Sequence, residues 1–138
     1  MSTEPTIFGR ILDGEIPCHR IHEDEHVLAF LDVGPLSRGH TLVIPKQRVP
    51  SLQDLSDASA AALGRILPRL VRAIAAVTGT EDCNVLINNG APAGQEVMHV
   101  HVHIIPVAEG QGLQKHWQAG ELPADEGADI AREIREMM

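Results

Sequence analysis

The sequence predicts an α+β fold with a mostly antiparallel sheet. Three observations support this class: several short apolar segments separated by turn residues, one long segment with helical apolar spacing, and no regular alternation of strand and helix. At 138 residues, 43% of them hydrophobic, the chain is long enough for one compact domain and too short for two. We therefore expect a single α+β domain over residues 1–138.

Five segments have strand character, because apolar and β-branched residues dominate them while Gly, Pro or acidic residues bound them. They are Arg20–His22, His26–Leu31, Thr41–Ile44, Val85–Ile87 and Val97–Pro106. The last of these is the clearest, and it follows a loop rich in Gly, Pro and Asn at 88–94. We expect them to form one central sheet of about five strands.

Helical spacing is strongest over Asp57–Val77, where apolar residues recur every three or four positions and form one buried stripe. Pro68 within this segment should kink or divide the helix, and Gly79 should end it. Two shorter segments are also expected to be helical, Ile7–Leu12 as a short helix or turn and Ala124–Met138 as a C-terminal helix.

Charge and cysteine content restrict the classes of partner. Eleven basic against nineteen acidic residues give a formal charge of −8, which repels polyanions, so we expect no nucleic-acid partner. A small phosphorylated ligand is compatible with this charge, because backbone N–H groups can bind one phosphate locally. Cys18 and Cys83 lack the spacing of a zinc ribbon or a disulfide framework. Because no signal-peptide pattern and no membrane-spanning apolar run is present, we expect a cytoplasmic protein without a membrane partner.

The most informative feature of the sequence is the run His99-Val100-His101-Val102-His103. Alternate residues of a strand point to the same face, so the three imidazoles should share one side and the valines the other. From the composition, such a run is expected by chance in roughly one chain in a thousand of this length. The run therefore predicts a functional site.

Three interpretations of the run compete. A solvent-facing strand is the simplest, but composition makes it rare. A metal site needs nitrogen donors about 2.0 Å from one ion, whereas Cα atoms four residues apart on a strand lie ~13 Å apart, so only two of the rings could easily share it. Covalent catalysis explains all three rings, since neutral imidazole attacks phosphorus at pH 7 and a neighbouring histidine can protonate the leaving group. We favour this third interpretation, with His101 as the nucleophile.

The sequence resembles the histidine triad family of nucleotide hydrolases and transferases. The family motif, His-φ-His-φ-His-φ-φ with φ apolar, appears here at residues 99–105. Further similar segments occur, in the family's order, at 6–11, 15–17, 28–32, 40–46 and 94–95. The resemblance covers about residues 6–106 and leaves a C-terminal tail at 107–138. It implies a homodimer with a continuous sheet.

The resemblance also implies catalytic roles. It makes His101 the nucleophile that attacks the α-phosphate and forms a nucleotidyl-histidine, from which water releases a nucleoside monophosphate. His99 matches the position whose main chain and ring orient that nucleophile. His103 matches the position that contacts the phosphate and leaving group, and His40 matches a fourth histidine that backs the triad.

The other expected contacts are with the nucleotide. Asp32 matches the position that binds the ribose hydroxyls, although an aspartate at a strand end also commonly caps a turn. Asn88 aligns with an amide that hydrogen-bonds the phosphate end, and Gly94 and Gln95 lie where backbone N–H groups could meet phosphate oxygens. Four apolar residues, which would otherwise be counted as core, are expected to line the base pocket: Ile7, Phe8, Ile11 and Phe30.

The sequence also departs from the family pattern. Many bacterial members begin with a Cys-x-x-Cys pair that helps hold a structural zinc; here those positions are Thr6 and Gly9, so we expect no metal and no other cofactor. The N-terminus is instead similar to that of the purine nucleoside phosphoramidase branch. Glu96 replaces the Ser or Thr that often follows Gly-Gln. The tail is longer than in short phosphoramidases and contains His116 and Trp117, which the resemblance places within reach of the partner subunit's pocket.

The sequence thus predicts a hydrolase that cleaves nucleoside 5′-phosphoramidates and related nucleoside 5′-phosphate conjugates at the α-phosphate. Dinucleoside polyphosphate hydrolysis is an alternative within the same class. A nucleotide-binding sensor with little turnover is an alternative from another class, because the presence of a motif does not measure a rate.

Overall fold

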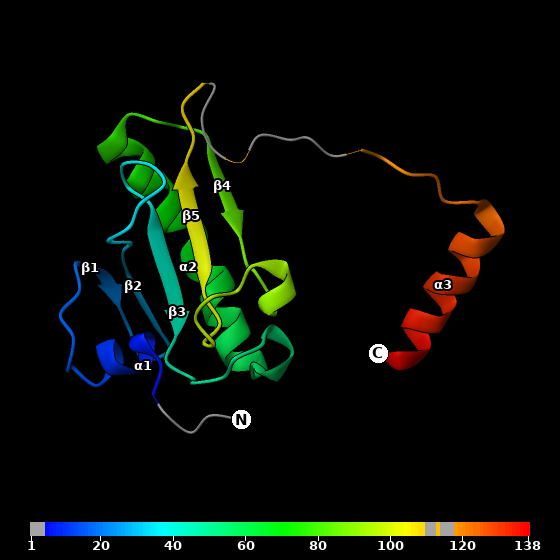
Figure 1. The fold of residues 1–138 in the computed structure, drawn as a ribbon, viewed down its shortest axis with the longest axis horizontal. Helices are drawn as coiled ribbons and strands as arrows, with labels where there is room; N and C mark the ends of the chain where they lie inside the picture. The colour runs from blue at the N-terminus through cyan, green and yellow to red at the C-terminus, as the bar shows by residue number, and fades with distance from the viewer. Residues whose placement is uncertain (1–4, 110–112, 114–117) are drawn as a thin grey trace.

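The computed structural model describes residues 5–109, 113 and 118–138, and it contains one five-stranded antiparallel sheet in the order β1-β2-β3-β5-β4 (Figure 1). The strands are β1 Arg20–Glu23, β2 Val27–Leu31, β3 Thr41–Pro45, β4 Cys83–Leu86 and β5 Val102–Pro106. The α-helices in the described ranges are α1 Ile7–Leu12, α2 Asp57–Thr78 and α3 Ala124–Met137, and short 3-10 turns lie at Leu52–Asp54 and Ala91–Ala93. The predicted α+β class and five-stranded antiparallel sheet are confirmed.

The prediction of one long strand over Val97–Pro106 is wrong in its first half. Strand β5 begins only at Val102, which pairs with Val43 of β3. Before it, the N–H of Val100 donates to the carbonyl of Val49 and the N–H of His99 donates to Val97, at 3.0 and 2.9 Å. These bonds replace the ladder with β3, so His99 and His101 lie on an irregular segment that enters the sheet.

The two faces of the sheet carry separate apolar clusters, and α2 covers one of them (Figure 1). The cluster beneath α2 includes Val100, Val102 and Ile104, which alternate with the three histidines of the run. The cluster on the opposite face includes Phe8 of α1, whose ring contacts His99 and His101. The predicted division of valines to one side and histidines to the other is therefore confirmed, although the strand itself starts late.

Helix α2 has well-formed ends. The Ser56 hydroxyl caps its start by accepting from the N–H of Ser59 at 3.1 Å, and Gly79 ends it in the left-handed conformation, at φ 70°. The helix runs through Pro68 unbroken, so the predicted division there does not occur. Pro68 lacks the N–H that would bond the carbonyl of Gly64, and Gly64 is exposed, so water can satisfy that carbonyl.

Helix α3 stands apart from the sheet domain (Figure 1), and none of its residues is buried. The expected C-terminal helix is thus present, but it buries none of its residues against the sheet. Among the helices of the described residues, none combines the length and the apolar character that crossing a membrane requires.

Candidate active site

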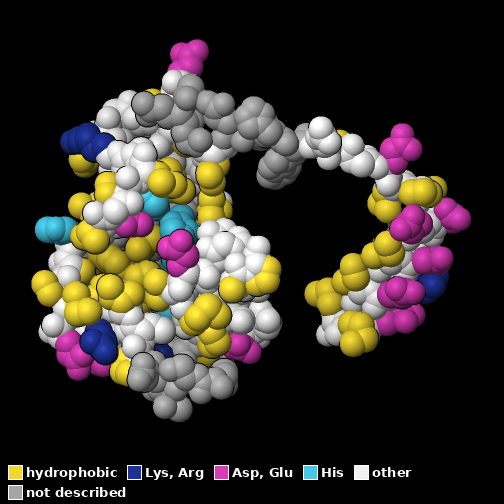
Figure 2. All heavy atoms as spheres, in the orientation of Figure 1, with side chains coloured by type: hydrophobic (Ala, Val, Ile, Leu, Met, Phe, Trp, Pro, Cys, Tyr) yellow, Lys and Arg dark blue, Asp and Glu magenta, His cyan; other side chains and the backbone are white. Residues whose placement is uncertain are grey.

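Four histidines from three separate segments meet on the sheet face opposite α2. The ring of His103, on β5, lies 4.9 Å from that of His101 and 5.2 Å from that of His40, measured between centroids. Figure 2 shows histidine side chains gathered near the middle of one face of the sheet domain, beside an apolar patch. The structure therefore brings together the four histidines that the sequence analysis selected.

His101 is held by one ring nitrogen, so the other is available. Its Nδ1 lies 2.7 Å from the carbonyl oxygen of His99. A carbonyl can only accept, so Nδ1 must carry the proton. In the neutral ring, Nε2 then presents an unprotonated lone pair, which is what a nucleophile toward phosphorus needs.

The ring of His103 carries its proton on the other nitrogen, Nε2, because hydrogen bonds link it through His40 to the backbone N–H of Leu36. The backbone N–H of Leu36 donates to Nδ1 of His40 at 3.1 Å, so the proton of neutral His40 must reside on Nε2. That Nε2 lies 2.9 Å from Nδ1 of His103 and donates to it. His103 in turn must carry its own proton on Nε2. A lone pair on His101 and an N–H on His103 therefore stand side by side.

Burial favours the neutral form of three of the histidines, His103, His40 and His99. It lowers the pKa of His103 to about 4, and positive charge on His101 or His40 would lower it further, while the nearby Asp32 carboxylate acts in the opposite direction. Burial also lowers the pKa of His40 and of His99. At neutral pH His103 is therefore a hydrogen-bond donor rather than a cationic acid.

His99 contributes through its backbone and its packing. The residue is only 1% exposed, and its Nε2 donates to the carbonyl of Pro45 at 2.8 Å. The backbone carbonyl of His99 accepts the hydrogen bond from Nδ1 of His101. This is the contact that an orienting residue would make with the nucleophile.

Asp32 lies at the end of β2 with its two oxygens in different surroundings. Oδ1 accepts from the N–H of Gly34 at 2.8 Å, which is the turn-capping role that the sequence left open. Oδ2 lies 3.6 Å from Nε2 of His40. One carboxylate oxygen is thus committed to the turn and the other faces the histidines.

Asp32, His40 and His103 each offer one ligand atom within 4.8 Å of the others, so they need testing as a metal site. A metal would require the lone pair of Nε2 in His40. The N–H of Leu36 occupies Nδ1 of that ring, which keeps the proton on Nε2. These residues therefore do not fit a metal without losing the Leu36 hydrogen bond.

A close glycine approach sets the position of His40. Gly39 has φ +91°, and a Cβ on it would lie 2.6 Å from Cγ2 of Thr78, at the end of α2. Only glycine allows β3 to start this close to α2 in that conformation. The end of the long helix thus fixes where the histidine that follows Gly39 enters the site.

Gln95 clamps the loop that leads into the histidine run. Its buried side-chain amide donates to the carbonyls of Pro50 and Val97, at 2.7 and 3.0 Å, and accepts from the N–H of Gly90 at 2.8 Å. Its own backbone N–H bonds Gly90 as well. The structure therefore gives Gln95 a positioning role, and direct contact of Gln95 with a nucleotide stays a prediction.

Two other loop residues lie next to each other. Gly94 is in the left-handed region, at φ +103°, and a Cβ there would be 3.5 Å from Nδ2 of Asn88. Gly94 is exposed and Asn88 is half-buried, so both remain accessible to a ligand. The phosphate contacts expected of them stay predictions.

The residues expected at the base pocket split into two groups. Phe8 and Phe30 are buried and pack edge to face, with centroids 5.7 Å apart, and Phe8 also meets the ring of His101 at 5.0 Å. Ile11 is half-buried against the same cluster, whereas Ile7 is 50% exposed. Their contact with a base stays a prediction.

Sequence reasoning missed several members of this site. Leu42, Ile44 and Val97 belong to the same apolar cluster as Phe8. The alternation within Thr41–Ile44 could have revealed Leu42 and Ile44, because they share a face with Phe30 across β2 and β3. Pro45 and Leu36 contribute backbone groups, a carbonyl and an N–H, so no side-chain type in the sequence could have revealed their roles. His116 and Trp117 lie outside the described residues.

Comparison with known proteins identifies the family. The HIT domain model matches residues 13–110, which is more than half of the chain. The chain belongs to the HIT domain family. Its relatives include a protein of Schizosaccharomyces pombe named adenosine 5′-monophosphoramidase, 44% identical over 93% of this chain and 94% of that one.

Two further HIT proteins define how far the likeness extends. An Arabidopsis thaliana protein named adenylylsulfatase is 44% identical over 75% of this chain, which spans only about half (52%) of that relative's length. A solved structure of a HIT family protein from Bacillus anthracis superposes with a TM-score of 0.93 at 37% identity, covering 99% of each chain. The fold is therefore shared along almost the whole chain, α3 included.

Proposed function

We propose that this HIT protein is a nucleotide hydrolase that cleaves nucleoside 5′-phosphoramidates and related conjugates at the α-phosphate. The observation that carries the proposal is the opposite polarity of two adjacent rings, a lone pair on Nε2 of His101 and an N–H on Nε2 of His103. Such a pair can attack phosphorus and at the same time bind a phosphoryl oxygen. The relatives named phosphoramidase and adenylylsulfatase support this class of substrate.

In the first step, Nε2 of His101 bonds to phosphorus and the P–N bond of the substrate breaks. The substrate binds with its nitrogen already protonated by solvent, so that nitrogen leaves as a neutral amine and no protein group loses a proton. In the new imidazolium, Nδ1 keeps its proton and donates it as a hydrogen bond to the carbonyl of His99, which stabilises the positive charge. His103 donates its Nε2 proton as a hydrogen bond to the phosphoryl group, as its low pKa requires.

In the second step, a water oxygen bonds to phosphorus and the Nε2–P bond breaks. The nucleoside monophosphate leaves, one water proton passes to solvent, and His101 recovers its lone pair. Because Nδ1 stays bonded to His99 throughout, the ring does not need to rotate between steps.

Recognition of the nucleotide follows the expected assignments. Asp32 keeps one oxygen that is not used in the turn, and we assign it to the ribose hydroxyls. Asn88 and Gly94 bind the phosphate end, with Gln95 holding their loop, and the cluster around Phe8 and Phe30 receives the base. On the family resemblance, the chain acts as a homodimer in the cytoplasm and needs no cofactor.

Hydrolysis of dinucleoside polyphosphates is the second candidate. Glu96, exposed beside Gln95, carries a negative charge near the loop expected to meet phosphate. That charge repels a long polyphosphate more strongly than a single phosphoryl group, which favours the phosphoramidate.

The substrate class can be tested on one preparation by measuring kcat/KM for adenosine phosphoramidate and diadenosine tetraphosphate, with and without EDTA. We expect the phosphoramidate to be preferred by at least about tenfold, with no effect of EDTA. A preference for the tetraphosphate would select the second candidate. Loss of activity with EDTA would restore the metal interpretation, and no turnover of either compound would favour a sensor.

A further inference from the structure

Helix α1 is too short to hold its own position beside the histidines. It has only six residues, Ile7–Leu12, and an isolated helix of that length does not form in water. The buried ring of Phe8 on this helix packs edge to face against the ring of His101, with centroids 5.0 Å apart. The place of this wall of the site therefore depends on contacts that α1 makes with other segments.

A forked ion pair joins the end of α1 to the loop that follows β3. Asp13 ends the helix, and both of its carboxylate oxygens accept from the guanidinium of Arg48, Oδ2 from Nη1 at 3.1 Å and Oδ1 from Nη2 at a shorter distance. These bonds hold the pKa of the Asp13 carboxyl below its usual value. A fork of two bonds fixes the orientation of both groups as well as their separation, which a single bond does not.

Arg48 also lies along the side of α1. Its Nη1 is 3.6 Å from the place that a Cβ on Gly9 would occupy, and Gly9 is buried although it has no side chain. Gly9 directly follows Phe8 in the helix. The guanidinium thus lies beside α1 next to Phe8 and binds it at Asp13, so it opposes a tilt of the helix as well as a shift.

The loop that carries Arg48 also holds the histidine run and its approach. Three of its backbone carbonyls accept hydrogen bonds from that segment, at 2.8, 3.0 and 2.7 Å: those of Pro45, Val49 and Pro50, which bind His99, Val100 and Gln95 in that order. One loop therefore fixes the run through its backbone and α1 through the side chain of Arg48.

The ion pair is too exposed to be explained by the stability of the whole fold. The side chains of Arg48 and Asp13 are 47% and 40% exposed, and ion pairs in such places add little to the stability of a folded chain. Their effect is instead local, because they join the two segments between which Phe8 meets His101. The separation of these segments sets the width of the apolar cluster that we assign to the base.

We propose that Arg48 and Asp13 are a positioning pair that sets the width of the base pocket by holding α1 at a fixed distance from the histidine run. Neither residue touches the substrate, and both act through Phe8. The proposal rests on the proposed function, because it needs the base to lie in the cluster around Phe8 and Phe30. When the pair is broken, α1 can move away from the run, so the base loses contact while the ribose and phosphate keep theirs.

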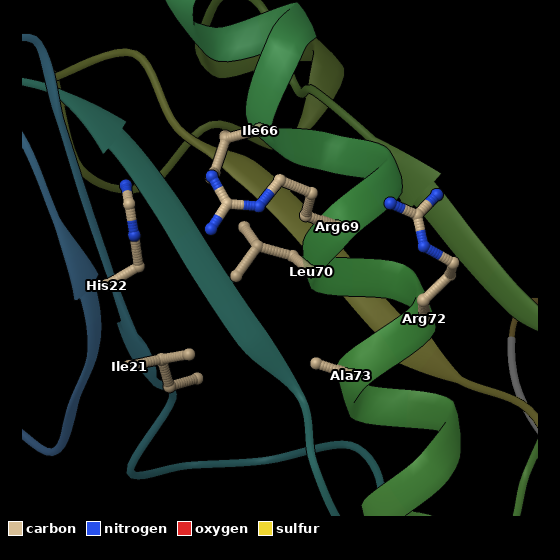
Figure 3. A pocket seen from close by; sticks show the side chains of 7 residues that line it. All are labelled: Ile21, His22, Ile66, Arg69, Leu70, Arg72 and Ala73. Atoms are coloured by element: carbon tan, nitrogen blue, oxygen red, sulfur yellow. The ribbon is translucent and has the colours of Figure 1, made fainter.

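An arginine on the other face of the sheet provides the control. Arg69 lines the α2–β1 groove, a hollow of about 500 Å³ between these two elements whose apolar lining includes Ile21, Ile66 and Leu70 (Figure 3). Its guanidinium extends over the groove toward the sheet. In the described part of the chain, Arg69 has no carboxylate within ion-pair distance, so its replacement breaks no pair.

Binding of AMP and of ribose 5-phosphate, measured by NMR titration, separates the base from the rest of the nucleotide. Arg48→Met should weaken AMP by about tenfold and leave ribose 5-phosphate within about twofold of the parent. Arg48→Lys keeps the charge but loses the fork, so it should recover only part of the affinity for AMP. Arg69→Met should change neither ligand. Equal weakening of both ligands by Arg48→Met, or no weakening, would overturn the proposal.

A double-mutant cycle tests whether the two residues act together. Asp13→Ala should weaken AMP about as much as Arg48→Met, and the double variant should be no weaker than either, because one interaction is missing in all three. Losses that multiply in the double variant would overturn the pair. The midpoint of thermal unfolding should fall by less than about 4 °C in each variant. A larger fall would assign the pair to general stability and overturn the proposal.

The same preparations keep this proposal apart from the proposed hydrolysis. If the binding pattern is found but the parent turns over no phosphoramidate, the pair stands and the hydrolysis fails. If the parent hydrolyses the phosphoramidate but the variants bind AMP as tightly as the parent, the pair fails and the hydrolysis stands. A parent that binds AMP no more tightly than ribose 5-phosphate would overturn the base pocket, and this proposal with it.

Discussion

The histidine site and the α2–β1 groove differ in how completely one chain satisfies them. At the histidines, the ring nitrogens of His40, His99 and His101 named above bond to partners in the same chain, and no buried side-chain polar atom among the described residues lacks a partner. At the groove, Arg69 has no acidic partner among the described residues, and α3, none of whose residues is buried, does not cover the apolar side chains. The first region is preorganised within one chain, whereas the described residues of the same chain leave the second without a polar or apolar partner.

This contrast predicts a separation of effects. Changes at the histidines should alter chemistry and nucleotide binding. Changes to the exposed surface of α2 and β1, on the other face of the sheet, should leave both unchanged. The predictions below test the first half of that separation, from the largest expected effect to the smallest.

Replacing His101 by Ala should lower kcat for adenosine phosphoramidate by about 10⁴-fold or more, because no other group presents a lone pair at that place. Binding of AMP, measured by calorimetry, should remain within a few-fold of the parent. His26→Ala, at a histidine that is 41% exposed and away from the site, is the control and should keep full activity. Turnover retained by the His101 variant would exclude it as the nucleophile.

Replacing Asp32 by Asn should weaken binding of AMP by about 10- to 100-fold, because a charge-assisted hydrogen bond to the ribose is lost. Binding of the 2′,3′-dideoxy analogue should hardly change. Asn retains an oxygen that can accept from Gly34, so the turn is preserved. Asp82→Asn, at an exposed site, is the matched control. Equal losses for the two nucleotides would contradict a ribose contact.

Replacing Gln95 by Leu should lower the free energy of unfolding by about 1–3 kcal/mol, since the half-buried N–H of Gly90 and the carbonyl of Pro50 lose their partner. Urea denaturation measures this loss. Gln53→Leu, at an exposed residue, should cost much less. If the two variants were equally stable, the loop clamp would not be a stabilising feature.

The lowered pKa of His103 predicts a pH dependence of stability. Below pH 6.5 the unfolded chain binds a proton at this histidine that the folded chain resists until about pH 4, so stability should fall as the pH drops from about 6.5 to 4. His40 and His99, shifted in the same direction, add to the fall. Asp24, with its pKa lowered to about 2, contributes only below about pH 4. Urea unfolding at pH 7.5 and 4.5 should show a smaller drop for His103→Gln than for the parent chain.

Much of the fold was predictable from residue patterns. The stripe in Asp57–Val77 located α2 to within a residue of its end, and Gly79 ends it as expected. The long strand at Val97–Pro106 was overestimated, because side-chain alternation continues through His99 and Val100 even where the backbone bonds to Val49 instead of β3. Periodicity reports which side a residue faces and not where its backbone hydrogen bonds go.

The same limit on prediction applies to the site: residue types were predictable from the sequence, and backbone hydrogen bonds were not. The motif at 99–105 identified three of the histidines and the family resemblance identified His40, and the structure brings these residues together. Their polarity was not predictable, because it depends on three backbone groups, the carbonyls of His99 and Pro45 and the N–H of Leu36. Nor could the sequence show that Gln95 is already fully engaged by the loop it holds.

The central claim is the opposite polarity of His101 and His103, and their tautomers can be measured directly. In uniformly ¹⁵N-labelled protein at pH 7.5, long-range ¹H–¹⁵N correlation spectra distinguish protonated Nδ1 from protonated Nε2 in each ring, with His101→Ala and His103→Gln used for assignment. We predict His101 protonated at Nδ1 and His103 protonated at Nε2. A spectrum with His101 protonated at Nε2, or with both rings in the same tautomer, would contradict the account.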